Sequence, residues 1–232
     1  MPEKLSVQIS EGQTVTALIY PSAARERVGV TLLLGHGAGA DQTSGFMVSF
    51  AEAFAARGID AATFNFLYTE QGRRAPDRND KLEQCYRAVI DAVRAHPKLQ
   101  GNSLVIGGKS MGGRIASQVA AKGVEGLAGL VFFGYPLHPP GKPDQLRAEH
   151  LSRINAPMLF VQGSRDAFGT PEELRPVIEQ LGGAATLRVI GGGDHSFKVP
   201  KSSGLSPEDV FSGIQDTVSS WLRHTALERS AS

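Results

Sequence analysis

A serine at position 110 stands in a pattern that can make its hydroxyl reactive. Residues 108–112 read Gly-Lys-Ser-Met-Gly, the G-x-S-x-G sequence of a sharp strand-to-helix turn with the serine at its bend. Such a turn strains the serine backbone, and the two flanking glycines leave room for it. The serine then lies at a helix N-terminus, where free N–H groups favour the negative charge that develops in acyl transfer. The pattern predicts a nucleophile that attacks carbonyl carbon.

Asp166 and His195 can supply the proton transfers that a serine nucleophile needs. Like Ser110, each stands at the carboxyl end of a predicted strand, where ligand sites of α/β sheets lie. A histidine takes the proton of the serine hydroxyl and returns it to the leaving group, while a carboxylate holds the imidazole in one tautomer. The chain order Ser, Asp, His is known for such triads. We therefore expect these three residues to form the catalytic set.

A tetrahedral intermediate also needs donors for its oxyanion. The backbone N–H of Met111, directly after the nucleophile, is one candidate by position. The second is expected from the Gly-His-Gly-Ala-Gly loop at residues 35–39, where small residues let a backbone N–H face the site, and we assign it to Ala38. His36 in the same loop is expected to anchor the loop through its ring rather than to act as a second base.

The substrate cavity is expected above Ser110, between the loop at residues 67–78 and the segment at residues 135–153. Candidates to line it are His36, Gly37, Lys109, Tyr135 and His138.

Other polar residues near these motifs admit two interpretations. Arg73, Arg74 and Lys109 could attract an anionic substrate, and a solvated polar loop explains them equally well. His138 and His150 could line the pocket or lie at the surface.

Rival site residues have simpler structural explanations. Asp194 precedes His195 directly, and neighbouring residues rarely point to one partner, so we expect it to stabilise its loop. Glu172 and Glu173 fit the first turn of a helix, and Cys85 fits a buried thiol. The sequence has neither HExxH nor CxxC, which predicts no metal site. The two glycine-rich stretches, GHGAGAD and IGGKSMGG, lack the spacing of a phosphate-binding loop.

Apolar runs and helical patterns alternate along the chain, which predicts an α/β fold with a mostly parallel central sheet flanked by helices. Residues 7–9 and 15–20 read as an antiparallel hairpin at one edge of the sheet. Further strands are expected at 28–34, 59–66, 104–106, 127–133, 157–161 and 186–190, and helices at 46–57, from 79 or 80 to about 96, 111–121, 145–154, 170–181 and 206–226. Residues 228–232 look frayed.

Composition limits the class of protein. The chain has 232 residues, 41% of them hydrophobic, and a formal net charge of +1. These values predict one globular domain over residues 1–232, with a short insertion at about 135–153 and no preference for nucleic acid or membrane. A single cysteine and an N-terminus without signal-peptide character predict a cytoplasmic protein. The expected partner is a small-molecule substrate, with no cofactor, and the protein is expected to be a monomer or small homo-oligomer.

Six stretches together resemble the α/β-hydrolase-like family that includes bacterial dienelactone-hydrolase-type proteins. They are LLLGHGAGA, TFNF followed by GRRAPD, GGKSMGGR, VFFGYPLHPPGK, LFVQGSRD and GGDHSF. Eukaryotic relatives in this resemblance include a testis-expressed protein and a subunit of a chromatin-modifying complex. The resemblance spans almost the whole chain and implies an α/β-hydrolase fold without a large cap domain, with Ser110, Asp166 and His195 as triad. Dienelactone hydrolases carry cysteine at the position of Ser110, so dienelactone is not the expected substrate.

The resulting hypothesis is a serine hydrolase that cleaves small carboxylic esters or thioesters through an acyl-serine intermediate. Two alternatives remain open at this point. One is a small peptidase of the same fold. The other is a catalytically idle scaffold of this fold that binds a protein partner.

Overall fold

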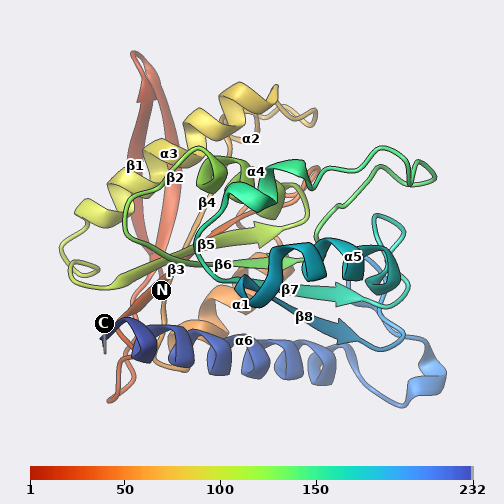
Figure 1. Cartoon of the computed structure of the whole chain (residues 1–232). Helices are drawn as coiled ribbons and strands as arrows, with labels where there is room; N and C mark the ends of the chain where they lie inside the picture. Colours follow the sequence, from red (N-terminus) through yellow and green to blue (C-terminus); the bar gives the residue numbers. More distant parts are fainter. Residues whose placement is uncertain (231–232) are drawn as a thin grey trace.

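The computed structural model describes the backbone of residues 1–230 and the side chains as far as Ala226. Eight strands form one sheet in the order β1-β2-β4-β3-β5-β6-β7-β8. The pairs β1·β2 and β2·β4 are antiparallel, and all later pairs are parallel. The mostly parallel sheet with an N-terminal hairpin at its edge is therefore confirmed (Figure 1).

The strands are β1 (Glu3–Ser10), β2 (Gln13–Tyr20), β3 (Val30–Gly35), β4 (Asp60–Phe64), β5 (Ser103–Lys109), β6 (Leu127–Phe133), β7 (Met158–Gly163) and β8 (Ala185–Ile190). The α-helices are α1 (Gly45–Ala56), α2 (Leu67–Glu70), α3 (Asn79–Ala95), α4 (Met111–Ala121), α5 (Pro171–Leu181) and α6 (Pro207–Ser230). Short 3₁₀ turns are η1 (Glu149–Arg153), η2 (Gly182–Ala184) and η3 (Lys201–Ser203).

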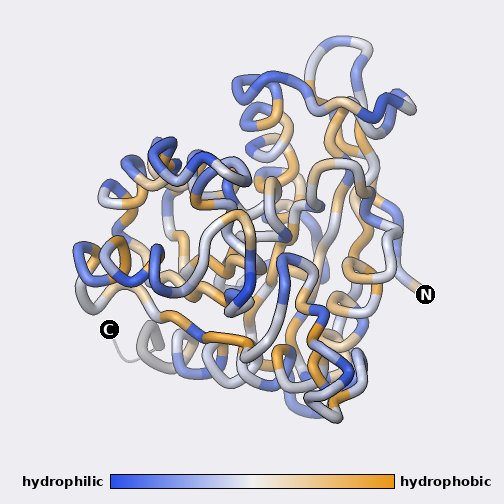
Figure 2. The backbone as a smooth tube through the Cα atoms, turned by 90° about the vertical axis from the view of Figure 1, so that its right-hand side faces the viewer, coloured by the Kyte–Doolittle hydropathy of each residue, from blue (hydrophilic) through white to orange (hydrophobic). Residues whose placement is uncertain are grey.

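Helices cover both faces of the sheet. Helices α3, α4 and α5 pack on one face, and α1 and α6 pack on the other (Figure 1). Successive residues of a strand point to opposite faces, so in β3 Leu33 joins the first core while Leu32 and Leu34 join the second. The apolar colouring of the central strands in Figure 2 follows from burial on both sides.

Helix α4 packs unusually close to the backbone of β3. A Cβ atom at Gly112 would lie 2.1 Å from the carbonyl oxygen of Gly35, and one at Gly108 would lie 2.2 Å from the same oxygen. Gly108 also has a φ of 151°, which side chains rarely adopt. The two glycines that flank Ser110 are therefore required by packing, and they bring the start of α4 to the carboxyl edge of the sheet.

The structure differs from expectation in three segments. The expected loop after β4 contains the short helix α2. The helix expected at 145–154 is only the 3₁₀ turn η1, because the backbone before it bonds elsewhere. Arg147 N–H donates to Leu137 O at 2.7 Å, and the Tyr135 hydroxyl donates to Arg147 O. Helix α6 includes residues 228–230, expected to fray, and residues 231–232 lie outside the described part.

The segment from 134 to 157, between β6 and β7, contains no α-helix, and the fold has no large cap. Within residues 1–230, no helix is long and apolar enough to cross a bilayer.

Candidate active site

Three strand ends bring Ser110, Asp166 and His195 together at the carboxyl edge of the sheet. Ser110 follows β5, and the other two residues lie in the loops after β7 and β8. His195 Nε2 lies 2.8 Å from Ser110 Oγ. His195 Nδ1 lies 2.9 Å and 2.8 Å from the two carboxylate oxygens of Asp166. A continuous hydrogen-bonded path therefore joins hydroxyl, imidazole and carboxylate.

Burial differs along this path. The Asp166 side chain is 0% exposed, whereas the His195 side chain is 21% exposed. A buried carboxylate must be fully hydrogen-bonded to be stable, while a partly open imidazole can reach a bound molecule. A substrate could therefore reach the path at His195 and not at Asp166, as the reaction would require.

The backbone of Ser110 is strained. Its φ is 50° and its ψ is −113°, values that cost a residue other than glycine about 1–3 kcal/mol. Ser110 N–H donates to Phe133 O at 3.0 Å, and Ser110 O accepts from Arg114 N at 3.1 Å, which begins α4. Hydrogen bonds to β6 and α4 thus hold Ser110 in a backbone conformation that is unfavourable for serine.

Gln162 and Phe168 orient the side chains of Asp166 and His195, and the sequence analysis did not single out either residue. Gln162 Nε2 donates to Asp166 Oδ2 at 2.9 Å, and Phe168 N–H donates to Asp166 Oδ1 at 2.9 Å. The Phe168 ring also packs against the imidazole of His195, with 4.2 Å between centroids. A glutamine inside the apolar strand MLFVQG was the available signal for the first of these, because a buried amide needs polar partners.

Lys109 supports the histidine loop from behind. Its ammonium donates to the backbone carbonyl of His195 at 2.5 Å and lies 5.4 Å from the centroid of the Phe197 ring. Burial lowers the pKa of Lys109 to about 8, while the charges of Asp166 and Asp194 act in the opposite direction. The ammonium is thus bound to the protein itself rather than to bulk water.

The expected oxyanion donors, Met111 and Ala38, belong to two different segments, the start of α4 and the loop after β3. Met111 is the first residue of α4, so its N–H belongs to the first turn, where helices leave donors free. Gly37 packs against the serine, since a Cβ at Gly37 would lie 3.7 Å from Ser110 Cβ. Ala38, the next residue, is exposed at the loop surface.

His36 anchors the loop that carries Gly37 and Ala38. Its Nε2 accepts from Phe66 N–H at 3.2 Å, so its Nδ1 carries the proton that faces Gly37 O at 2.9 Å. Burial lowers the pKa of His36, which favours this neutral form. The expected anchoring role fits this geometry. The ring is fully buried, however, so His36 does not line a pocket.

Two other expected pocket residues are also buried. The Tyr135 hydroxyl is engaged with Arg147 O at 2.7 Å. His138 Nδ1 lies 2.8 Å from Pro139 O, and its Nε2 lies 3.4 Å from Glu173 Oε1. The Tyr135 hydroxyl thus bonds within the 135–153 segment, and His138 links that segment to α5; both side chains are buried, and neither lines the cavity described below.

The rival site residues act structurally. Asp194 Oδ1 accepts from the backbone N–H groups of Ser196 and Lys198 at 2.8 Å and 2.9 Å, and so stabilises its own loop. Glu173 forms a capping box with Thr170 at the start of α5. Cys85 is buried, and this burial raises the pKa of its thiol to about 12, which makes it unreactive.

A cavity of about 500 Å³ adjoins the site, but not where the sequence predicts it. It opens between the start of α1, the loop that follows His195, and the start of α6. Lys109 and Ser196, the chain neighbours of Ser110 and His195, form part of its wall. None of its lining residues comes from the segments 67–78 or 135–153.

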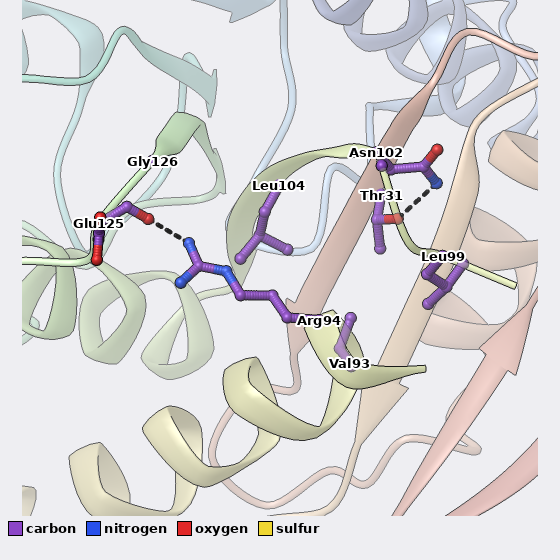
Figure 3. Close-up of a pocket in the computed structure, with 9 residues that line it drawn as sticks. Thr31, Val93, Arg94, Leu99, Asn102, Leu104, Glu125 and Gly126 are labelled. Carbon is purple, nitrogen blue, oxygen red and sulfur yellow. Dashed lines mark hydrogen bonds between the residues drawn. The ribbon is translucent and has the colours of Figure 1, made fainter. Parts of the chain in front are cut away.

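A smaller cavity of about 300 Å³ lies at the opposite, amino edge of the sheet (Figure 3). Thr31 and Leu104, at the starts of β3 and β5, line it, and Asn102 Nδ2 donates to Thr31 Oγ1 at 2.9 Å. The strand length separates it from Ser110.

The comparison with known families decides the classification. Residues 28–223 match the model of an alpha/beta hydrolase domain. The chain belongs to the alpha/beta hydrolase family. The matched range contains Ser110, Asp166 and His195, and the sheet order described above is that of an α/β-hydrolase fold.

Solved α/β hydrolases share this fold over nearly the whole chain. An alpha-beta serine hydrolase homologue from Coxiella burnetii has a TM-score of 0.69 at 19% identity, covering 96% of each chain. A serine hydrolase without a lid from Xanthomonas campestris has a TM-score of 0.70 at 19% identity, covering 98% of this chain and 94% of the other. Dienelactone hydrolase from Anabaena variabilis has a TM-score of 0.70 at 20% identity, covering 96% and 98%.

Proposed function

We propose that this chain is a serine hydrolase that cleaves small carboxylic esters or thioesters through an acyl-serine intermediate. The observation that carries the proposal is the hydrogen-bonded path from Ser110 Oγ through His195 to the buried carboxylate of Asp166. The strained backbone of Ser110 adds support, because such strain persists where function requires it.

In the first half of the reaction, Ser110 Oγ attacks the carbonyl carbon while His195 Nε2 accepts the hydroxyl proton. Asp166 stabilises the resulting imidazolium through Nδ1–H. The carbonyl oxygen becomes an oxyanion that the N–H groups of Met111 and Ala38 bind. The intermediate then collapses, the bond to the leaving oxygen or sulfur breaks, and His195 returns the proton to it.

In the second half, a water molecule takes the place of the leaving group. His195 removes a proton from the water, the hydroxide attacks the acyl carbon, and the acid leaves as Ser110 recovers its proton. The chemistry is the same for an oxygen or a sulfur leaving group.

Fluorophosphonate labelling tests this proposal directly. The folded protein should react at one residue, identified as Ser110 by peptide mass spectrometry, and Ser110→Ala should not react. Folded protein that leaves the probe untouched would support the idle scaffold instead.

Parallel kinetics on 4-nitrophenyl acetate, an acyl thioester and an aminoacyl amide then separate the enzyme classes. We expect turnover of the ester and the thioester, and an amide rate lower by at least about two orders of magnitude. Faster cleavage of the amide would identify a peptidase and contradict the proposed substrate class.

A further inference from the structure

The 500 Å³ cavity that Lys109 and Ser196 help to line is mainly apolar. Six of its lining residues are apolar, and they come from three separate parts of the chain: Phe46, Phe197, Val199, Leu205, Pro207 and Phe211. Small-molecule sites are typically concave and apolar with a few polar groups. The cavity has the size and the composition of such a site.

The turn after His195 builds one wall of this cavity at a conformational cost. Phe197 has a φ of 63°, and Ser110 is the other non-glycine residue with positive φ among the described residues. For a bulky side chain this conformation is a genuine outlier. Asp194 holds it in place, since its backbone O accepts from Phe197 N–H at 2.9 Å and its Oδ1 binds the two flanking N–H groups.

Lys109 connects the cavity to the nucleophile. Lys109 directly precedes Ser110, and its side chain lines the cavity and reaches the Phe197 ring. A molecule in the cavity can therefore contact Lys109, the residue directly before Ser110, whereas in the proposed reaction the leaving group must meet His195 Nε2. This arrangement favours the acyl part of the substrate as the occupant.

The charged lining residues have one sign. Lys109, Lys198 and Lys201 line the cavity, and its lining includes neither Asp nor Glu. Among the described residues, none of the three lysines forms an ion pair with a carboxylate within 4.0 Å. Lys198 and Lys201 are exposed, so they can meet a negative group at the mouth while the apolar wall binds hydrocarbon.

We propose that this cavity binds the acyl chain of the substrate and that Lys198 and Lys201 select acyl chains that end in a carboxylate. The proposal rests on the hydrolase function proposed above and names the substrate class of the same site: half-esters or half-thioesters of medium-length dicarboxylic acids.

Three chromogenic esters separate the contributions. 4-Nitrophenyl acetate reports the chemistry alone, 4-nitrophenyl hexanoate adds the apolar chain, and mono-4-nitrophenyl adipate adds a carboxylate at the same chain length. We expect kcat/KM to rise about tenfold from acetate to hexanoate and about fivefold more from hexanoate to adipate. The second increase should shrink at high salt.

Matched variants assign these preferences to the cavity. Leu205 and Leu146 are 53% and 58% exposed, and only Leu205 lines the cavity. Leu205→Gln should lower the hexanoate-to-acetate ratio about threefold, and Leu146→Gln should leave it unchanged. Lys198→Gln with Lys201→Gln should abolish most of the adipate preference, and Lys142→Gln should not.

The outcomes distinguish this proposal from the proposed function. If the wild-type protein neither hydrolyses 4-nitrophenyl acetate nor reacts with the probe at Ser110, both the proposed function and the cavity proposal are overturned. Active protein with equal rates on hexanoate and adipate would overturn the anion preference alone. A chain-length preference that appears only when the alcohol is varied, as in hexyl acetate, would assign the cavity to the leaving group and overturn the acyl assignment.

Discussion

Two serine–histidine pairs lie along helix α4, and their distances are almost the same. His195 Nε2 lies 2.8 Å from Ser110 Oγ at the start of the helix. His150 Nε2 lies 2.7 Å from Ser117 Oγ, two turns further on. Only the surroundings distinguish the two pairs.

The direction of the proton differs between them. Ser117 donates its own hydroxyl proton to Arg114 O at 2.7 Å, so the hydrogen between Ser117 and His150 must come from the imidazole. Burial, and then the positive charges of Arg153 and Arg114, lower the pKa of His150 to about 4. The ring is therefore a poor base at neutral pH. His195 instead has a carboxylate behind it.

Access differs as well. Ser117 is fully buried inside α4, so no substrate reaches its hydroxyl. If the proposed function holds, a short contact between serine and histidine is thus not enough for catalysis. A carboxylate on the far ring nitrogen, an open face and nearby backbone donors make the difference.

The largest expected effect contrasts the two serines. Ser110→Ala should lower kcat/KM for 4-nitrophenyl acetate by about six orders of magnitude, because the nucleophile is lost. Ser117→Ala should change kcat/KM less than about twofold, yet lower the free energy of unfolding by about 1 kcal/mol, because it leaves the N–H of the partly buried His150 imidazole without its acceptor. Steady-state kinetics and urea unfolding measure both. A large rate loss in Ser117→Ala would show that the buried pair also contributes to the reaction.

The next effect concerns the carboxylate that only one pair possesses. Asp166→Asn should reduce kcat by about four orders of magnitude, because the amide favours the wrong tautomer of His195. Asp194→Asn is the matched control. Its side-chain oxygen can still accept the two loop N–H groups, and we expect a loss below about tenfold. The reverse ranking would make Asp194 the triad acid.

The smallest effect is a pH dependence of stability that belongs to His150. Its folded pKa of about 4 lies below the ordinary 6.5, so the unfolded chain binds a proton first as pH falls. Stability is therefore lost between about pH 6.5 and pH 4, by about 2 kcal/mol for this partly exposed group. In His150→Gln, urea unfolding across this range should be flatter by that amount. An unchanged slope would argue against the lowered pKa.

Much of the fold follows from local patterns. The apolar runs that became β3, β5, β6 and β7 are buried on both faces, which is why they read as continuous apolar sequence. The segment at 145–154 defeated the same logic. Its residues have a helical pattern, but the backbone N–H and carbonyl of Arg147 bond to Leu137 O and to the Tyr135 hydroxyl in the turn after β6. The local pattern of residues 145–154 does not indicate these contacts.

The site divides in the same way. The geometry around Ser110 is local, since glycines at 108 and 112 are required within one turn, and the sequence pattern predicted it. The support from Gln162 and Lys109, and the cavity walls formed by Phe46 and Phe211, depend on residues far apart in the chain meeting at one edge. The spacing of residues along the sequence does not indicate which distant residues come into contact.

The strained backbone of Ser110 implies a trade-off between thermal stability and the proposed activity. A glycine at position 110 would remove this backbone strain, and the removal of strain would by itself raise the melting temperature. Laboratory evolution that rewards heat resistance alone would therefore tend to discard the nucleophile. Any programme to harden this protein must screen for hydrolysis in every round.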